Sequence, residues 1–369
     1  MKHLIALLLL AAPAWAQVAQ DPPNVPHFKP AFEGQTRAPE AISGALETEI
    51  LAEGMEHPWG IAPLPGGDYL LSDREGTLHV LATQGGLSAP IMGMPKIAVR
   101  AQGGLLDVAI SPGFATDRLV YWSYAKPVGA GRTSLAVGQG ELSADRAELR
   151  NVRDVFVQPN PSLSPLHYGS RLVFAPDGAL FVTTGERFTD RDLAQDPKST
   201  YGKVLRIKEG QTTIWSMGHR NIQGAALDAT GQLWTVEHGP QGGDELNVIK
   251  RGANYGWPVI SYGENYNGTR VGKGITQAEG MEQPIYYWDP VIAPGGMLFY
   301  DGPMFAKGDV YIASLNPGGL VRLRLKEGRV ATEERLFPGY RIRDVEQAPD
   351  GALIVLVDGT GEVWRVTPK

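Results

Sequence analysis

The 369-residue sequence contains no cysteine. This absence excludes disulfide scaffolds, thiolate zinc sites, iron–sulfur clusters, a cysteine nucleophile and a lipid-modified cysteine. The sequence also lacks long runs of one charge, since 34 Lys and Arg face 40 Asp and Glu for a net charge of −6. A general nucleic-acid binder is therefore not expected. Any chemistry must use oxygen and nitrogen groups or a bound cofactor.

Long hydrophobic runs are also absent, except at the N-terminus. There Lys2 is followed by an apolar run from Leu4 to Ala12 and by the small-residue pattern Ala14-Trp-Ala16. The order is typical of a secretory signal peptide that is cleaved after Ala16. The alternative, a membrane anchor, is disfavoured because the run is too short to cross ~30 Å of hydrocarbon. We therefore predict a signal peptide over residues 1–16, a periplasmic or secreted protein, and no stable membrane anchor.

Turn-forming residues are abundant, with 46 Gly and 28 Pro, while 43% of the residues are hydrophobic. This composition is rich in turns but still able to bury a sizeable core. Residues 17–45 carry many prolines and little apolar periodicity, so we expect an extended or flexible lead-in there. The folded domain is predicted to occupy residues 46–369.

One sequence motif recurs six times in that domain: an apolar strand, a turn related to Pro-Asp-Gly, and a second strand rich in Leu, Tyr and Val. Each copy is typical of a β-hairpin, and most are followed by a further strand. The copies lie at 61–71, 108–122, 172–182, 225–235, 297–312 and 345–355. Periodic short strands of this kind predict an all-β fold, a six-bladed β-propeller of four-stranded antiparallel blades. A β-sandwich and a parallel β-helix are the alternatives, although the length and uneven repeat fit them less well.

The uneven repeat length points to the functional face. The excess residues fall in 125–168, 183–203 and 238–294, which we interpret as long loops on one face, the top of the propeller. Among the histidines, His167 ends such a loop just before an apolar strand, and Glu186 ends the paired strand of the same hairpin. A histidine placed there can take a proton from a hydroxyl, and the carboxylate can orient it. A structural histidine and a solvated glutamate remain the alternatives.

Cationic residues stand at two further strand starts. Arg220 and Asn221 precede the fourth repeat, and Arg341 and Arg343 open the sixth, where alternation sends them to one side. Two guanidinium groups near the axis of an acidic protein suit a polyanionic small ligand. The alternative is salt bridging to Asp344 or Glu346.

The stretch 237–246 combines carboxylates with a glycine-rich backbone that is free to turn its carbonyl groups inward. Hard oxygen ligands of this kind suit Ca²⁺. An ordinary surface loop is the alternative, because Gly-Gly-Asp-Glu is not specific.

Taken together, these segments resemble the soluble aldose sugar dehydrogenases that depend on pyrroloquinoline quinone (PQQ), in the glucose/sorbosone dehydrogenase family. The resemblance covers about residues 46–366. It rests on motifs that occur in the family's order: His57-Pro-Trp-Gly60, Gln102-Gly-Gly-Leu-Leu-Asp107, His167-Tyr-Gly-Ser-Arg-Leu172, Gly218-His-Arg-Asn221, Glu237-His-Gly-Pro-Gln-Gly-Gly-Asp-Glu245, Asn254-Tyr-Gly-Trp-Pro258 and Arg341-Ile-Arg343.

The resemblance implies that PQQ lies over the tunnel mouth of the propeller. His167 then matches the general base, Arg220 and Asn221 the pair beside the quinone carbonyl, and Arg341 and Arg343 a guanidinium pair at the cofactor. Two further matching contacts are Gln102 and Tyr266. The implied reaction is oxidation of an aldose at C1 to the lactone, with hydride passing to PQQ and electrons leaving to an external acceptor. The absence of cysteine is compatible with this, since the cofactor supplies the redox chemistry.

Two calcium ions are also implied. The backbone carbonyls of Gly239 and Pro240 match ligands of the ion at PQQ, and Glu245 with the backbone of Tyr255 matches a structural site. One cofactor contact departs from the pattern: Asn316 stands where many relatives carry Lys, which keeps a hydrogen-bond donor and loses a positive charge. Two alternatives remain: a six-bladed Ca²⁺-dependent lactonase or hydrolase, and a propeller that binds carbohydrate without catalysis.

Overall fold

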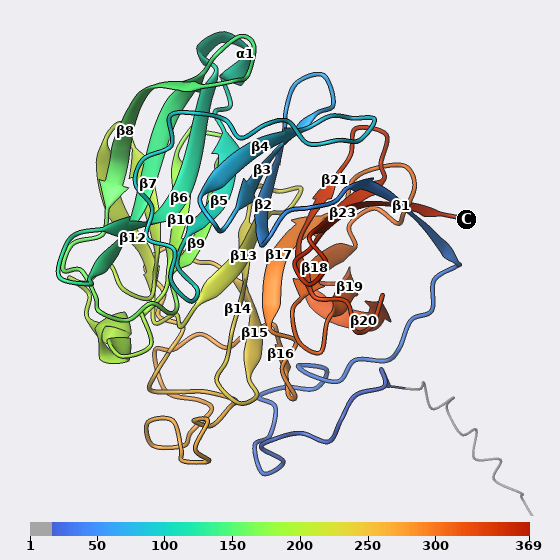
Figure 1. Ribbon diagram of the computed structural model, residues 1–369. Coiled ribbons are helices and arrows are strands. Elements are labelled where there is room, and N and C mark those ends of the chain that lie inside the picture. The colour runs from blue at the N-terminus through green and yellow to red at the C-terminus, as the bar shows by residue number, and fades with distance from the viewer. Residues whose placement is uncertain (1–16) are drawn as a thin grey trace, which may run out of the picture.

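The computed structural model describes residues 17–369, and these residues form six antiparallel blades around a central axis (Figure 1). The first strand of each blade lies innermost. The inner strands contact one another in a closed ring, in the order β2, β5, β9, β13, β17 and β21. The predicted all-β, six-bladed propeller is thereby confirmed. The predicted signal peptide, residues 1–16, lies outside the described residues.

The first three blades follow one another along the chain. Blade 1 consists of β2 (Pro58–Pro63), β3 (Tyr69–Asp73) and β4 (Thr77–Leu81). Blade 2 consists of β5 (Leu105–Ile110), β6 (Leu119–Pro127), β7 (Thr133–Leu142) and β8 (Leu149–Val157). Blade 3 consists of β9 (Gly169–Phe174), β10 (Leu180–Thr184), β11 (Lys203–Lys208) and β12 (Gln211–Met217). A short helix, α1 (Phe114–Asp117), and a 3-10 helix, η1 (Arg191–Gln195), lie in loops of blades 2 and 3.

The last three blades complete the ring. Blade 4 consists of β13 (Ile222–Leu227), β14 (Leu233–Glu237), β15 (Asp244–Val248) and β16 (Tyr286–Trp288). Blade 5 consists of β17 (Pro294–Phe299), β18 (Val310–Ser314), β19 (Gly319–Lys326) and β20 (Arg329–Leu336). Blade 6 consists of β21 (Ile342–Gln347), β22 (Leu353–Val357) and β23 (Glu362–Pro368), with β1 (Leu46–Ala52) as its outer strand.

The two ends of the domain meet in blade 6. Strand β1 pairs antiparallel with β23, from Leu46 opposite Pro368 to Ala52 opposite Val363. The ring is therefore closed by backbone hydrogen bonds between the start and the end of the domain. Residues 17–45 precede this strand and pack along blades 4 and 5. In that segment the Gln35 side chain is buried and donates from Nε2 to the carbonyl of Pro284 at 2.8 Å.

Two details of the predicted architecture are wrong. Blade 1 has three strands, because residues 87–91 replace the fourth strand with a few hydrogen bonds to β4, such as Ser88 N–H to the Val80 carbonyl at 2.8 Å. Pro90 within this segment has no N–H to donate, so a regular ladder cannot form. In addition, the expected loop 125–168 contains strands β7 and β8, so that only residues 158–168 form a long connection on the functional face.

The hairpin turns follow from the Pro-Asp-Gly chemistry. Between β9 and β10, Ala175 N–H donates to the Ala179 carbonyl at 2.7 Å, and Asp177 Oδ1 accepts the N–H of Ala179 at 3.2 Å. Gly178 has φ +80°, a conformation that side-chain-bearing residues avoid. The glycine therefore fixes the turn and the register of the strands that follow.

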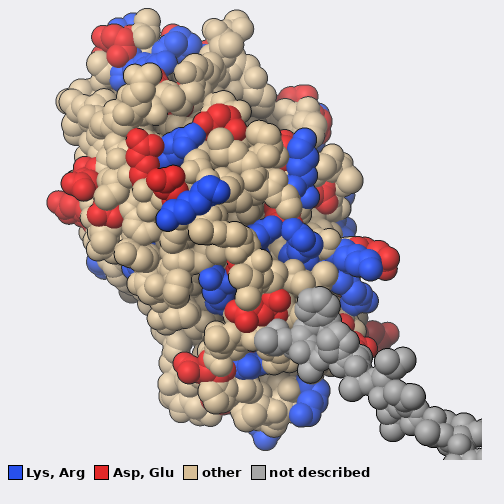
Figure 2. Space-filling view, turned by 90° about the vertical axis from the view of Figure 1, so that its right-hand side faces the viewer, with Lys and Arg blue, Asp and Glu red and all other residues tan. Residues whose placement is uncertain are grey.

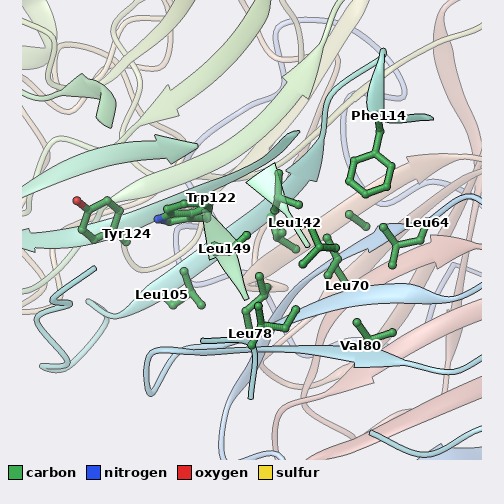
Figure 3. Close-up of a cluster of buried hydrophobic side chains, with 14 of the residues drawn as sticks. Leu64, Leu70, Leu78, Val80, Leu105, Phe114, Trp122, Tyr124, Leu142 and Leu149 are labelled. Atoms are coloured by element: carbon green, nitrogen blue, oxygen red, sulfur yellow. The ribbon is translucent and has the colours of Figure 1, made fainter. Parts of the chain in front are cut away.

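Adjacent blades are held together by apolar side chains. Between blades 1 and 2, Leu70 and Leu78 pack with Trp122 and Leu142, and all four side chains are fully buried (Figure 3). Each blade buries one face against the next, so the core is a ring of such clusters. On the face seen in Figure 2, the outer charged side chains are intermixed and do not separate by sign. Within residues 17–369 no helix is both long and apolar enough to cross a membrane.

A glycine allows the indole of Trp122 to lie flat against β7. A Cβ added at Gly138 would lie 2.6 Å from Trp122 Nε1, so the ring would have to move. We expect Gly138→Ala to lower the free energy of unfolding by about 1–3 kcal/mol through overpacking. Chemical denaturation measures this. Gly44→Ala is the matched control, because a Cβ there meets nothing within 4 Å. Equal stability of the two variants would contradict the packing argument.

Candidate active site

The candidate residues gather at one end of the blades. In an antiparallel hairpin, the residue before the first strand and the residue after the second strand lie at the same end. Residues 167, 220 and 341 precede inner strands, and residues 186, 238 and 358 follow the strands paired with them. They therefore ring the axis on one face, toward the lower edge of Figure 1, opposite α1. The long connection 249–285 starts and ends at the other end of β15 and β16, but its middle part reaches this face, where Glu264 pairs with Gln241.

The first pair of functional groups is His167 and Glu186. The His167 side chain is 6% exposed, and its Nδ1 lies 3.0 Å from Glu186 Oε1. The second carboxylate oxygen of Glu186 accepts the N–H of Phe188. An ionised carboxylate can only accept hydrogen bonds, so Nδ1 of His167 carries the proton and Nε2 keeps a lone pair. The pair thus has the arrangement of a base with an orienting acid.

The backbone around His167 is tightly constrained. His167 has φ +51°, and its N–H donates to Gln102 Oε1 at 2.7 Å. A Cβ at Gly185 would lie 2.1 Å from the His167 carbonyl oxygen, so only glycine fits there. The buried Arg187 guanidinium donates to the Leu166 carbonyl at 3.0 Å and also to the carbonyl of Ser164. These contacts hold the imidazole in one position.

Arg220 lies at the start of blade 4, beside this pair. Its Nη1 donates to the His238 carbonyl at 3.1 Å, and its Nη2 lies 3.4 Å from the Tyr266 hydroxyl. Its guanidinium also lies 5.2 Å from the ring centroid of Trp257. The buried Nε has no hydrogen-bond partner in the part of the chain that the structure describes. Arg220 therefore has an unused donor that an anion or a carbonyl oxygen could occupy.

The neighbouring Asn221 has a different environment. It is buried, and its Oδ1 accepts the N–H of Gly169 at 3.0 Å, which ties blade 4 to the strand that follows His167. Asn221 therefore helps to set the separation between Arg220 and His167.

A cleft of about 460 Å³ opens between Glu186, Arg220 and the long connection. Aromatic side chains contribute much of its wall, and Glu186 is its only acidic residue among the described residues that line it. The lining residues are Glu186, Phe188, Arg191, Arg220, Pro240, Trp257, Asn265, Tyr266, Asn267 and Thr269. Aromatic faces with a few polar groups are typical of a site for a small polar ligand.

The arginine pair of blade 6 has a partner that the sequence did not indicate. Arg341 Nε donates to Asp358 Oδ2 at 2.6 Å, and Arg343 Nη2 lies 3.9 Å from the same oxygen. The alternative of salt bridges to Asp344 or Glu346 is therefore wrong, because Asp344 pairs with Arg171 instead. The register of β21 shifts between Ile342 and Asp344, so regular alternation does not hold at Arg343, whereas Asp358 follows the paired strand at the same end.

Asn316 lies near this pair, but within residues 17–369 no hydrogen bond joins its side chain to either arginine. Asn316 is exposed, and Arg341 Nη1 lies 3.3 Å from the carbonyl of the preceding residue, Leu315. The structure thus brings the blade 5 and blade 6 candidates to one rim. Gln102 and Tyr266 are also exposed on this face, and both contact candidate residues, His167 and Arg220 respectively.

The predicted calcium ligands lie in two neighbouring places. Gly239, Glu245 and Tyr255 line one cavity of about 10 Å³, room for a single ion or water, whereas Pro240 lines the larger cleft. Burial raises the pKa of Glu245 well above its usual range, and the nearby Glu237 adds to this. No group of three or more acidic or histidine side chains suited to a metal occurs within residues 17–369. An ion here would depend on backbone oxygens.

Comparison with known proteins decides the family. The model of the Glucose / Sorbosone dehydrogenase family matches residues 55–365. The chain belongs to the glucose/sorbosone dehydrogenase family. Among its relatives, Aldose sugar dehydrogenase YliI of Escherichia coli (strain K12) is 37% identical over 353 residues, which cover 89% of this chain and 95% of the relative.

Solved structures of family members agree in fold. The crystal structure of the soluble aldose sugar dehydrogenase from E. coli, in the apo form, has a TM-score of 0.83 and 37% identity, covering 88% of this chain and 100% of that chain. The PQQ-bound aldose sugar dehydrogenase from Streptomyces coelicolor has a TM-score of 0.73 and 30% identity, covering 89% and 99%. The resemblance to quinoprotein aldose dehydrogenases, and with it the prediction of an enzyme of that type, is confirmed.

Two residues of this family member, His238 and Gln223, contact the predicted site, and the sequence assigned no role to either. His238 lies among Arg220, Arg343 and His167, and burial lowers its pKa well below the usual range, with the charges of the two arginines adding to the effect. Gln223 Oε1 accepts from Arg343 Nη1 at 2.7 Å and lies 3.2 Å from His238 Nε2. Gln223 lies near the start of β13, and His238 directly follows β14. Both positions are at the end of the hairpin opposite its turn, and this placement is the sequence signal that could have indicated them.

The acid–base properties of His167 lead to a pH prediction. Burial lowers the pKa of His167 below 6.5, and Arg220 lowers it further, while Glu186 acts in the opposite direction. The neutral imidazole is therefore present at pH 7 and is lost as the pH falls through this lowered pKa. We expect sugar oxidation to decline on an acid limb below about pH 6.5.

The pH–rate profile of kcat/KM, recorded with Ca²⁺ and PQQ saturating, measures this limb. Glu186→Gln removes the carboxylate that raises the pKa, so the limb is expected at lower pH and the plateau at a lower rate. A limb centred above pH 7, or the same profile in Glu186→Gln, would contradict this account of the pair.

Proposed function

We propose that this protein is a PQQ- and Ca²⁺-dependent aldose dehydrogenase that oxidises the sugar at C1 to the lactone and passes electrons to an external acceptor. The observation that carries the proposal is the His167–Glu186 pair, which lies on the same rim as two arginines with unused buried donors. Nε of Arg220 and Nε of Arg343 are both buried without a partner among residues 17–369. The signal-like sequence 1–16 supports a periplasmic or secreted location.

The residues fit the implied cofactor. PQQ is a planar tricarboxylate, and the guanidinium group of arginine forms bidentate hydrogen bonds with carboxylates. Arg220, Arg341 and Arg343 would hold the carboxylates and the quinone edge, with Asn221, Gln102, Tyr266 and Asn316 as polar neighbours. When bound, PQQ supplies an ortho-quinone that accepts hydride, and Ca²⁺ polarises one of its carbonyl groups.

The calcium assignment is supported by the backbone at 239–245. A Cβ at Gly239 would lie 2.3 Å from the Gly242 carbonyl oxygen, so only glycine permits this compact turn. The Gly239 N–H donates to the buried Asp244 at 2.7 Å, which anchors the residue whose carbonyl would hold the ion together with that of Pro240. Glu245 and the Tyr255 backbone would hold the second, structural ion.

In the proposed mechanism, His167 supplies the base. Its Nε2 takes the proton of the anomeric hydroxyl, and the negative charge of Glu186 stabilises the imidazolium that forms. The sugar would occupy the cleft against Phe188 and Trp257, whose apolar rings suit the faces of a pyranose and keep water from the reacting carbon. Arg220 lies beside this position and favours the development of negative charge.

The test is reconstitution. The purified protein is incubated with PQQ and Ca²⁺, and dye reduction is followed with glucose and other aldoses. We expect sugar-dependent reduction that requires both PQQ and Ca²⁺. Hydrolysis of a lactone without PQQ would favour the hydrolase alternative, and sugar binding without PQQ binding would favour a carbohydrate-binding propeller.

A further inference from the structure

One arginine on the functional rim has no role in the site described so far. Arg74 follows β3 in blade 1, the same end of its hairpin that carries Glu186 in blade 3 and Asp358 in blade 6. Its N–H donates to the His57 carbonyl at 2.9 Å, and His57 Nδ1 lies 3.0 Å from Asp358 Oδ1. Arg74 therefore lies between blades 2 and 6, next to the group that holds Arg341 and Arg343.

Gly104 leaves room for the Arg74 side chain to pack against blade 2. A Cβ at Gly104 would lie 2.5 Å from Arg74 Cγ and 2.0 Å from the Arg74 carbonyl oxygen. The Leu105 N–H also donates to that carbonyl at 3.1 Å. The stem of Arg74 is thus packed against the backbone two residues after Gln102, another candidate cofactor contact.

The guanidinium of Arg74 is incompletely satisfied. Its Nε is buried and has no hydrogen-bond partner in the chain from residue 17 onward. Its Nη2 has one loose ionic contact, 3.5 Å from Glu75 Oε1, and both side chains are partly exposed. A buried donor without a partner is costly, so a ligand that accepts from it would be bound favourably.

The rim around Arg74 has an excess of positive charge. Asp358 is shared by Arg341 and Arg343. Burial lowers the pKa of Arg343 to about 10, Asp358 opposes this, and the charges of Arg341, Arg171 and Arg74 lower it further. These cations are therefore close enough to repel one another, which favours a multivalent anion between them.

We propose that Arg74 binds a carboxylate of PQQ together with Arg341 and Arg343. PQQ carries three carboxylates, whereas Arg220, Arg341 and Arg343 supply three positive charges of which Asp358 neutralises one. Arg74, whose contact with Glu75 is loose and partly exposed, adds a further positive charge to this group. The inference rests on the proposed function.

The experiment is a PQQ titration of the apo protein, followed by absorption and by tryptophan fluorescence. Arg74→Met keeps the packed stem and removes the charge, and we expect its Kd for PQQ to rise about 10- to 100-fold. Arg74→Lys restores the charge without the fork and is expected to give an intermediate Kd. The control Arg365→Met removes a surface ion pair with Asp350 and should bind PQQ as the wild type does. Melting temperatures of the apo proteins report whether each variant is folded.

The outcomes are distinguishable. A wild-type protein that does not bind PQQ would overturn the proposed function and this inference with it. Binding by Arg74→Met within twofold of the wild type, with Arg343→Met clearly weakened, would overturn the role of Arg74 alone. If Arg74→Met fails to fold, the folded Arg74→Lys variant provides the test. An unchanged Kd for PQQ and an unchanged salt dependence of that Kd in Arg74→Lys would contradict a bidentate contact between Arg74 and a carboxylate.

Discussion

His167→Asn is expected to lower kcat for sugar oxidation by about 10²- to 10⁴-fold, the range that general base catalysis contributes. Asparagine is the informative substitution because residue 167 has φ +51°, a left-handed conformation that Asn tolerates better than Ala. The amide can still donate to Glu186, but it has no lone pair basic enough to accept the proton. The loss should therefore appear in kcat, with little change in the Kd for PQQ.

Steady-state dye reduction and PQQ titration measure the two quantities separately. His27→Asn is the matched control, since His27 is exposed in the lead-in segment and should leave activity unchanged. Retention of more than a tenth of the wild-type kcat in His167→Asn would remove His167 from the role of base. A parallel loss of PQQ binding would instead assign it to the cofactor site.

Arg171→Met is expected to have the largest effect on stability, about 3–5 kcal/mol of the free energy of unfolding. Arg171 in β9 donates from Nη1 to Asp107 Oδ1 at 2.9 Å and to Asp344 Oδ2 at 2.8 Å, and all three side chains are buried. Its Nε donates to the Gln223 carbonyl at 3.1 Å, and its guanidinium lies 4.8 Å from the Trp59 ring centroid. One side chain thus connects the inner strands of five blades, and its loss leaves two buried carboxylates unpaired.

The pH dependence of this loss has a definite sign. Burial raises the pKa of Asp107 to about 7 even though Arg171 opposes the shift, so removal of Arg171 raises it further. When the pKa of a carboxyl group is raised on folding, ionisation of that group destabilises the folded state. The free energy of unfolding therefore falls as the pH rises. The deficit of Arg171→Met should therefore be larger at pH 8 than at pH 5.

Denaturant unfolding at the two pH values measures the deficit. The triple variant Asp107→Asn/Arg171→Met/Asp344→Asn should recover part of the lost stability, because it leaves no buried charge. Arg365→Met, which removes an exposed ion pair, should cost at most about 1 kcal/mol. If Arg171→Met is as stable as that control, the axial network does not hold the blades together.

Local sequence patterns predicted much of the fold and of the candidate site. The turn at Pro176-Asp177-Gly178 and its relatives predicted hairpins, and six of them predicted six blades, because turn geometry depends on a few adjacent residues. The same hairpin logic placed His167 and Glu186 at one end of blade 3. Strands with many small residues, such as β7 with Gly138, were interpreted as loop because their packing partner, Trp122, is contributed by another strand.

The sequence by itself thus determined the repeat, the face that carries the candidate residues and the residue types available to a quinone cofactor. Only the tertiary structure decided the partners. Asp358 pairs with the Arg341–Arg343 rim, Arg171 lies between Asp107 and Asp344, and β1 closes the ring on β23. These pairings join residues that are far apart in the chain, and they depend on which side chains the closed ring brings to the axis. Local propensity carries no information about that arrangement.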